Sequence, residues 1–166
     1  GGKKSGKRGR GAEGKSLIAV AVEVKGRKTG RVRLAKIPDA SSNSLNTFIE
    51  SNIEKPSTII TDDWPSYNEL EKMGYTHKTQ KATVQDDDQE ILPNVHRIAS
   101  LLKRWMLGTH QSYLNKNKIE YYLDEYAFRY NRRTSTSRGL LFLRLMEQAV
   151  KISPVSYREI VTQNHG

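Results

Sequence analysis

The chain contains no cysteine among its 166 residues, which excludes disulfide bonds and thiolate metal sites. This absence is compatible with a reducing cytoplasm but does not by itself fix the compartment. The sequence also lacks any apolar run near the roughly 20 residues of a membrane helix, and it shows no signal-peptide pattern. We therefore expect no membrane partner. The first residue is glycine rather than methionine, which suggests a truncated or processed chain.

Acidic residues are few compared with basic ones. The chain has 18 Asp and Glu against 28 Lys and Arg, a formal net charge of +10 and a sequence pI of about 9.8. A domain this basic favours a polyanionic partner.

Much of the positive charge lies in residues 1–15, where Glu13 is the only carboxylate. Glycines separate the charges and no apolar periodicity is present, so we interpret this segment as a flexible loop or arm. We expect it to contact the DNA backbone, because basic residues recur later in the chain. The alternative is a disordered arm, or an expression remnant, that binds nothing specific. The basic residues are Lys3, Lys4, Lys7, Arg8, Arg10 and Lys15.

Hydrophobic patterning predicts an α/β domain with a mixed sheet. Apolar or alternating runs predict strands at 16–25, 29–37, 57–61 and 75–78, with a hairpin turn at 26–28. Helical spacing predicts helices at 42–53, 66–73, 95–107, 117–132 and 139–150, and residues 80–90 are expected to be a loop. Two antiparallel strands followed by crossover helices fit an RNase H-like sheet flanked by helices, with additional C-terminal helices.

A pair of carboxylates follows the strand predicted at 57–61. The segment STIITDDW ends that strand at Asp62 and Asp63. Ligand sites in open α/β sheets lie beyond strand ends, so an Asp at this point is well placed to bind a metal. The alternative is that one carboxylate caps the next helix and the other is solvated. Asp63 or Ser66 could provide the cap, which would leave Asp62 for the site.

The segment LPNVHRIASLLKRWMLGTHQ predicts a helix with a polar stripe. His96, Ser100 and Lys103 share one face at helical spacing. A metal ligand near the helix start and a cation two turns later would suit a phosphodiester. An amphipathic helix with a solvated polar stripe explains the same pattern. The opposite, buried face is predicted to hold Ile98, Leu101, Leu102 and Trp105.

Two further charged segments have competing interpretations. Asp86, Asp87, Asp88 and Glu90 could bind a hard cation, but their polar surroundings favour a solvated acidic loop. Late in the chain, basic and aromatic residues alternate. The tyrosines at positions 122, 126 and 130 are expected to be mostly core, whereas the arginines could neutralise phosphates. The candidate DNA contacts outside the arm are Arg104, Arg132, Arg133 and Arg138.

Four motifs in order resemble the DDE-type transposases of the bacterial insertion-sequence family numbered 1595. The resemblance spans roughly residues 1–161. The motifs are GGKKSGKRGRGAEGK, TDDWPSYNELEKMGY, HRIASLLKRWMLGTH and YLDEYAFRYNRRTSTSRG. One such motif alone would be suggestive, whereas four in this order are specific.

The resemblance implies an RNase H-like enzyme with three metal ligands and a nearby lysine. Asp62 matches the second ligand, His96 the third and Lys103 the lysine, which places the chain in the histidine subgroup. The first ligand is an Asp just before a GG pair, which here is Gly1 and Gly2, so it is expected upstream of this chain. The catalytic domain is then 16–150, truncated at its N-terminus, with a tail at 151–166.

The implied chemistry is two-metal phosphoryl transfer with Mg²⁺ or Mn²⁺. Imidazole is a poorer ligand for Mg²⁺ than for softer ions, so we expect tolerance of, or preference for, Mn²⁺. The expected partner is double-stranded DNA, both transposon ends and target, with a homo-oligomer in the active complex and a cytoplasmic, nucleoid-associated location. The alternatives are a structure-specific nuclease of the same architecture and a catalytically inactive DNA-binding remnant.

Overall fold

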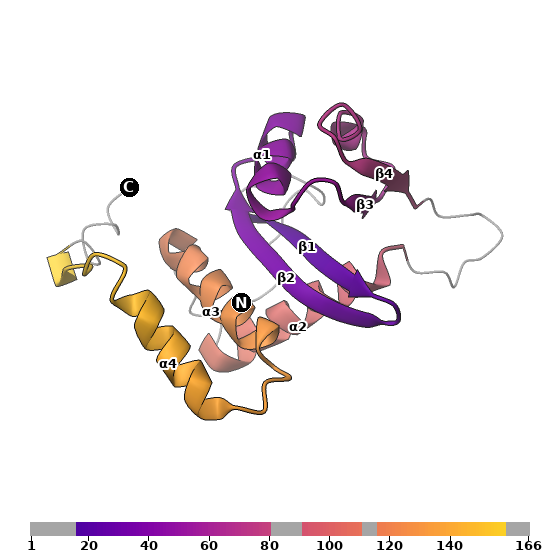
Figure 1. Cartoon of the computed structure of the whole chain (residues 1–166). Helices are drawn as coiled ribbons and strands as arrows, with labels where there is room; N and C mark the ends of the chain where they lie inside the picture. The colour runs from indigo at the N-terminus through magenta and orange to yellow at the C-terminus, as the bar shows by residue number, and fades with distance from the viewer. Residues whose placement is uncertain (1–15, 81–90, 111–115, 159–166) are drawn as a thin grey trace.

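The computed structural model describes residues 16–80, 91–110 and 116–158. In chain order the elements are β1 (Leu17–Lys25), β2 (Lys28–Ile37), α1 (Ser42–Asn52), β3 (Thr58–Thr61), the 3₁₀ helix η1 (Pro65–Tyr67), β4 (Thr76–Thr79), α2 (Pro93–His110), the 3₁₀ helix η2 (Lys116–Lys118), α3 (Ile119–Asn131) and α4 (Arg138–Ala149) (Figure 1). The predicted α/β class is confirmed, as are all the predicted strands.

The β1–β2 hairpin is the longest paired region of the fold. Its strands are antiparallel, with Val20 opposite Leu34, and the register shifts between Val22 and Val24. Gly26 has φ +58°, a left-handed conformation that glycine adopts without the Cβ clash of other residues. The hairpin turn is therefore where the sequence predicts it.

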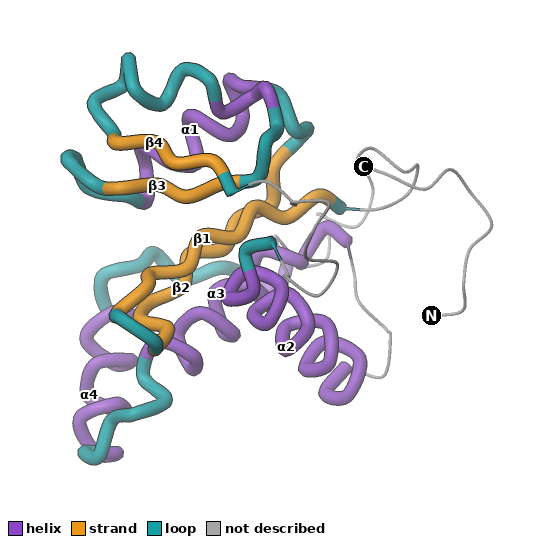
Figure 2. The backbone as a smooth tube through the Cα atoms, turned by 90° about the vertical axis from the view of Figure 1, so that its right-hand side faces the viewer, coloured by secondary structure: helices purple, strands orange, loops and turns teal. Residues whose placement is uncertain are grey.

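The two faces of the hairpin pack into two different cores, because successive strand residues point to opposite sides. One face packs against α1 and the segment around Leu70, and the other packs against α2 and α3 (Figure 2). The first core contains Ala19, Ile37, Leu45, Phe48, Ile49, Leu70 and Tyr75. The second contains Val32, Ile98, Leu102, Met106, Ile119, Leu123 and Tyr126.

The structure differs from the single mixed sheet that we expected. The described residues form two separate two-stranded sheets, β1 with β2 and β3 with β4. The second pair is parallel, with Ile59 opposite His77. In both views β1 lies between β2 and the β3–β4 pair (Figures 1 and 2). Within the described part of the chain, β1 pairs only with β2 and β3 pairs only with β4. No described strand pairs with the second edge of β1 or of β3, so the two sheets are not joined.

The helix predicted at 66–73 is wrong. Only η1 forms, and turns follow it as far as Gly74. Most of the backbone bonds span three residues, as from Leu70 to the Tyr67 carbonyl, and so do not continue as an α-helix. Leu70 is fully buried in the first core, and Gly74, with φ +90°, ends the segment. Tertiary burial of Leu70 thus overrides the weak local helical pattern.

The helix α4 lies apart from both cores. None of its residues is buried, and Phe142 is 68% exposed. Its other large exposed side chains are Leu140, Leu143, Leu145 and Met146. Among the described residues, no helix combines the length and the apolar character that crossing a membrane requires.

Candidate active site

Asp62 follows directly after β3, at a strand end that is held by buried polar contacts. Thr61, the last strand residue, is 6% exposed. Its hydroxyl donates to the Asp62 carbonyl at 2.8 Å and lies 2.8 Å from His77 Nε2. Because a hydroxyl has one proton to donate, His77 donates from Nε2 in this arrangement. Asp62 itself is half-buried, and Asp63 is exposed.

We considered Asp63 or Ser66 as the cap of the segment after Asp63. The N-cap residue of η1 is Trp64, whose own side chain makes no capping hydrogen bond. Capping by Asp63 stays a prediction. Ser66 instead donates its hydroxyl to the Ala40 carbonyl at 2.9 Å. Ser66 therefore ties this segment to the start of α1 and is not a helix cap.

The start of α2 is tied to the end of β3 through Gln80. The Gln80 backbone N–H donates to the Thr61 carbonyl at 2.8 Å, and its side-chain oxygen accepts from the Leu92 N–H at 3.4 Å. The Leu92 carbonyl then accepts from the His96 N–H at 3.1 Å. These contacts join the segment before Asp62 to the helical turn that carries His96.

Leu92 has φ +53°, which is uncommon and unfavourable for a residue with a branched side chain. Strained backbone conformations cluster at functional sites. Pro93 begins α2, and proline suits the first turn of a helix because no N–H is needed there. The helix therefore starts at a sharply defined place, one turn before His96.

The predicted division of α2 into two faces is confirmed. His96, Ser100 and Lys103 are all exposed, whereas Ile98 and Leu102 are buried. His96 and Lys103 are seven residues apart, which corresponds to roughly 10 Å along the helix axis. Leu101 and Trp105 are half-buried, and Met106, which the sequence reasoning missed, completes the buried stripe.

A complete metal-ligand set is not present in the described residues, where no group of three or more His, Cys, Asp or Glu side chains could hold a metal ion. Asp62 and His96 alone would provide one carboxylate and one imidazole. The acidic cluster Asp86–Glu90 lies outside the described residues. The basic arm residues Lys3, Lys4, Lys7, Arg8 and Arg10 lie outside them as well.

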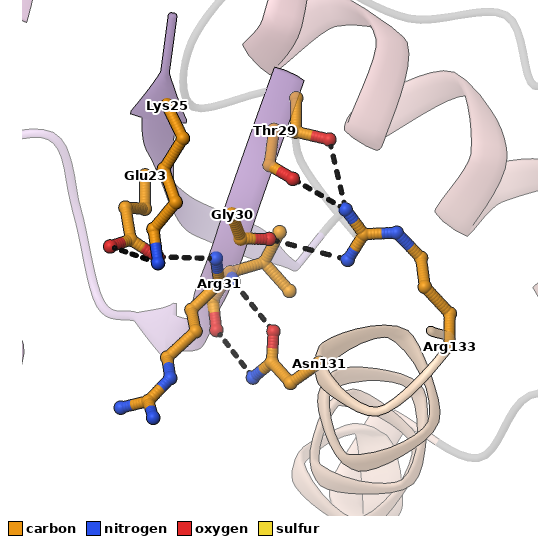
Figure 3. A network of polar contacts seen from close by, with 8 residues as sticks. Glu23, Lys25, Thr29, Gly30, Arg31, Asn131 and Arg133 are labelled. Carbon is orange, nitrogen blue, oxygen red and sulfur yellow. Dashed lines mark hydrogen bonds and ion pairs between the residues drawn. The ribbon is translucent and has the colours of Figure 1, made fainter. Parts of the chain in front are cut away.

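Of the arginines predicted to contact DNA, Arg132 and Arg133 also make contacts within the fold. Arg132 lies over the Phe128 ring at 3.9 Å, and Arg133 lies over the Tyr130 ring at 3.9 Å. The Arg133 guanidinium also donates to the carbonyls of Thr29 and Gly30 in the hairpin (Figure 3). Arg104 and Arg138 are exposed. DNA contact by these four arginines stays a prediction.

His77 is the polar residue near Asp62 that the sequence reasoning did not single out. Its ring centroid lies 6.5 Å from that of Tyr67, and its Nε2 contacts Thr61. The four-residue strand THKT gives no local sign of this contact, because the contact depends on the parallel pairing of β3 with β4.

An α/β domain with a strong positive charge and polar side chains at a strand end is typical of proteins that act on nucleic acids. The family model of the ISXO2-like transposase domain matches residues 1–131 of the 166. The chain therefore belongs to this transposase family, whose members are enzymes that cut and rearrange DNA. No curated protein and no solved structure matches the chain. The matched region includes Asp62, His96 and Lys103, and it ends at the last residue of α3.

Proposed function

We propose that this chain is the catalytic core of a DNA transposase that cleaves insertion-sequence ends and joins them to target DNA. Family membership supports the class of reaction. The observation that carries the site assignment is the series of hydrogen bonds through Thr61, Gln80 and Leu92. It connects the strand before Asp62 to the helical turn of His96, so residues 34 positions apart in sequence lie on connected segments.

Asp62 and His96 would hold divalent metal ions in this proposal. A carboxylate oxygen and a neutral imidazole nitrogen are both common donors for such ions. Two donors do not complete a site, so at least one further donor is needed. The bound ions would supply an activated water or DNA 3′-hydroxyl and would stabilise the leaving oxygen. The imidazole donor favours Mn²⁺ over Mg²⁺.

Lys103 would contact a DNA phosphate beside the reacting bond. Its exposed position on the same face as His96 lets the ammonium approach an oxyanion without rearrangement of the α2 core. Charge placed where negative charge develops in the transition state lowers the barrier most. This role of Lys103 requires its positive charge and not only its ability to donate hydrogen bonds. A Lys103→Gln variant should therefore not retain strand transfer.

An RNase H-like sheet would follow if one more strand lay between β1 and β3. Each of these strands pairs on one edge only within the described residues. Unpaired strand edges expose backbone N–H and C=O groups that readily accept another strand. A strand placed there would join the two sheets into one mixed sheet.

The test uses the full-length protein, element-end duplexes and a target plasmid, with Mg²⁺ or Mn²⁺. Asp62→Asn and His96→Ala should each reduce strand transfer by at least about 100-fold, the scale expected when a directly acting charge stabiliser is removed. Asp63→Asn, a matched carboxylate, and Lys72→Ala, a distant surface cation, should retain it. Unchanged transfer in both site variants would overturn the assignment. Cleavage without joining in the wild type would favour the nuclease alternative.

A further inference from the structure

The β1–β2 hairpin carries a strongly basic exposed surface that the proposed active site does not use. We call its turn-proximal part the basic hairpin and define it by the exposed cations Lys25, Arg27, Lys28, Arg31 and Arg33; Lys36, also exposed, lies at the far end of β2. In β2 the exposed arginines alternate with Val32, which is fully buried. The apolar side of this strand is therefore anchored in the second core, while the arginines on its other side remain exposed.

One carboxylate, Glu23, lies among these cations, but it is directed onto the hairpin backbone. Glu23 Oε2 accepts from the Arg31 backbone N–H at 2.8 Å, and Oε1 lies 3.3 Å from Lys25 Nζ. The hydrogen bond from the Arg31 N–H, more than the nearby lysine, holds the pKa of Glu23 below its ordinary value. The Arg31 guanidinium extends away from this contact (Figure 3). The five cations of the basic hairpin and the one carboxylate among them therefore leave a net charge of about +4 at neutral pH in this part of the hairpin.

The end of α3 fixes the hairpin from the other side. We call Tyr130, Asn131 and Arg133 the clamp. The Asn131 side chain accepts from the Val32 N–H at 2.7 Å and donates to the Val32 carbonyl at 3.0 Å. The Tyr130 hydroxyl lies 2.8 Å from Thr29 Oγ1, and Arg133 donates to the Thr29 and Gly30 carbonyls (Figure 3).

The clamp holds the tip of the hairpin in an ordered conformation. An isolated two-stranded hairpin is marginally stable in water, so its tip would fray. Asn131 instead pairs with the outer edge of β2 as one residue of an additional strand would. A binding surface that is already ordered loses less conformational entropy when a partner arrives. The positive charges near the turn are therefore presented on a fixed support.

We propose that the basic hairpin is a DNA-binding ribbon that contacts backbone phosphates away from the reacting bond. The proposal rests on the proposed function, because transposition requires DNA held on both sides of the cleavage point. In Figures 1 and 2 the hairpin turn lies apart from the β3–β4 pair. Arginine and lysine bind phosphates largely by releasing counterions, so the contact is independent of sequence and weakens with salt.

The test compares two charge-matched triple variants of the complete chain on a mixed-sequence DNA duplex. The hairpin variant is Arg27→Ala/Arg31→Ala/Arg33→Ala, and the control is Lys72→Ala/Arg144→Ala/Lys151→Ala, which removes three exposed cations from other surfaces. Fluorescence anisotropy gives the affinity at several salt concentrations. Each lost phosphate contact lowers the slope of log affinity against log salt by about one.

We expect the hairpin variant to lose about three in slope and at least about tenfold in affinity at low salt. The control should stay within about threefold of the wild type. Equal losses of affinity in both variants would overturn the proposal that the basic hairpin is a DNA-binding ribbon. DNA binding by the chain, and hence the proposed function, would remain intact. Absence of salt-dependent binding by the wild type would contradict both. If the triple variant fails to fold by circular dichroism, Arg33→Ala alone should lower the slope by about one, and an unchanged slope would overturn the proposal.

Discussion

Replacing Asn131 with alanine should destabilise the whole domain, although the side chain is only partly buried. Its amide group makes two hydrogen bonds to one residue, Val32, which is 0% exposed. The change removes both bonds and leaves the two backbone groups of Val32 without their partner. It also weakens the attachment of α3 to β2, two elements that both contribute to the second core, and leaves only the Tyr130 and Arg133 contacts of the clamp.

The expected cost follows from the number of bonds. A neutral hydrogen bond contributes about 0.5–1.5 kcal/mol net, so two give about 1–3 kcal/mol. Asn131→Asp should cost at least as much, because its carboxylate can accept from the Val32 N–H but cannot donate to the Val32 carbonyl. A change of this size is a substantial fraction of the stability of a small domain.

Urea unfolding followed by circular dichroism measures this loss, and hydrogen exchange localises it. The matched control is Asn52→Ala, whose amide donates only to the Phe48 carbonyl within its own helix. We expect the control to lie within about 0.5 kcal/mol of the wild type, because alanine also favours the helix. In Asn131→Ala the Val32 amide should exchange faster. If Asn131→Ala left both the urea midpoint and the exchange rate of the Val32 amide unchanged, the claim that Asn131 stabilises the hairpin would be refuted.

Burial predicts a sharp contrast between two leucines: Leu123→Ala, at 1% exposure, should cost about 2–5 kcal/mol in urea unfolding, whereas Leu143→Ala, at 51% exposure, should stay within about 0.5 kcal/mol. Equal losses would contradict the placement of α4 outside the cores. Hydrogen bonds from Ser41, followed by Ser44, lower the pKa of Asp39 below its ordinary value. A lowered folded-state pKa gives stabilisation that is present at neutral pH and is lost as pH falls through that pKa. Ser44→Ala should therefore raise the pKa of Asp39 in an NMR titration, and an unaltered titration would count against this contact.

The elements with strong periodicity were predictable from the sequence. The β1–β2 hairpin has a nearly all-apolar strand, a Gly turn and an alternating strand, and the structure confirms all three. The polar stripe of α2, from His96 to Lys103, follows from helical geometry alone. The N-cap of α1 follows the general preference for serine at this position, since the Ser41 hydroxyl accepts from the Ser44 N–H at 3.3 Å.

Features that depend on long-range pairing were not predictable. The motif containing Tyr130, Asn131 and Arg133 suggested core aromatics and phosphate contacts, but its polar groups bind a hairpin about 100 positions earlier. No local pattern encodes such a contact. The separation of the β3–β4 pair from β1 is of the same kind, because strand order depends on contacts between segments that are distant in the sequence.

The central claim is that Asp62, after the end of β3, and His96, in the first turns of α2, belong to the same metal-binding site. Paramagnetic broadening by Mn²⁺ tests it directly, because broadening detects weak binding even when the ligand set is incomplete. In the complete chain, low concentrations of Mn²⁺ should broaden the side-chain resonances of Asp62 and His96 together, before those of the exposed carboxylates Glu50 and Glu125. Asp62→Asn should remove the broadening at His96. Broadening that reaches the exposed carboxylates first, or that leaves His96 unaffected, would contradict the assignment.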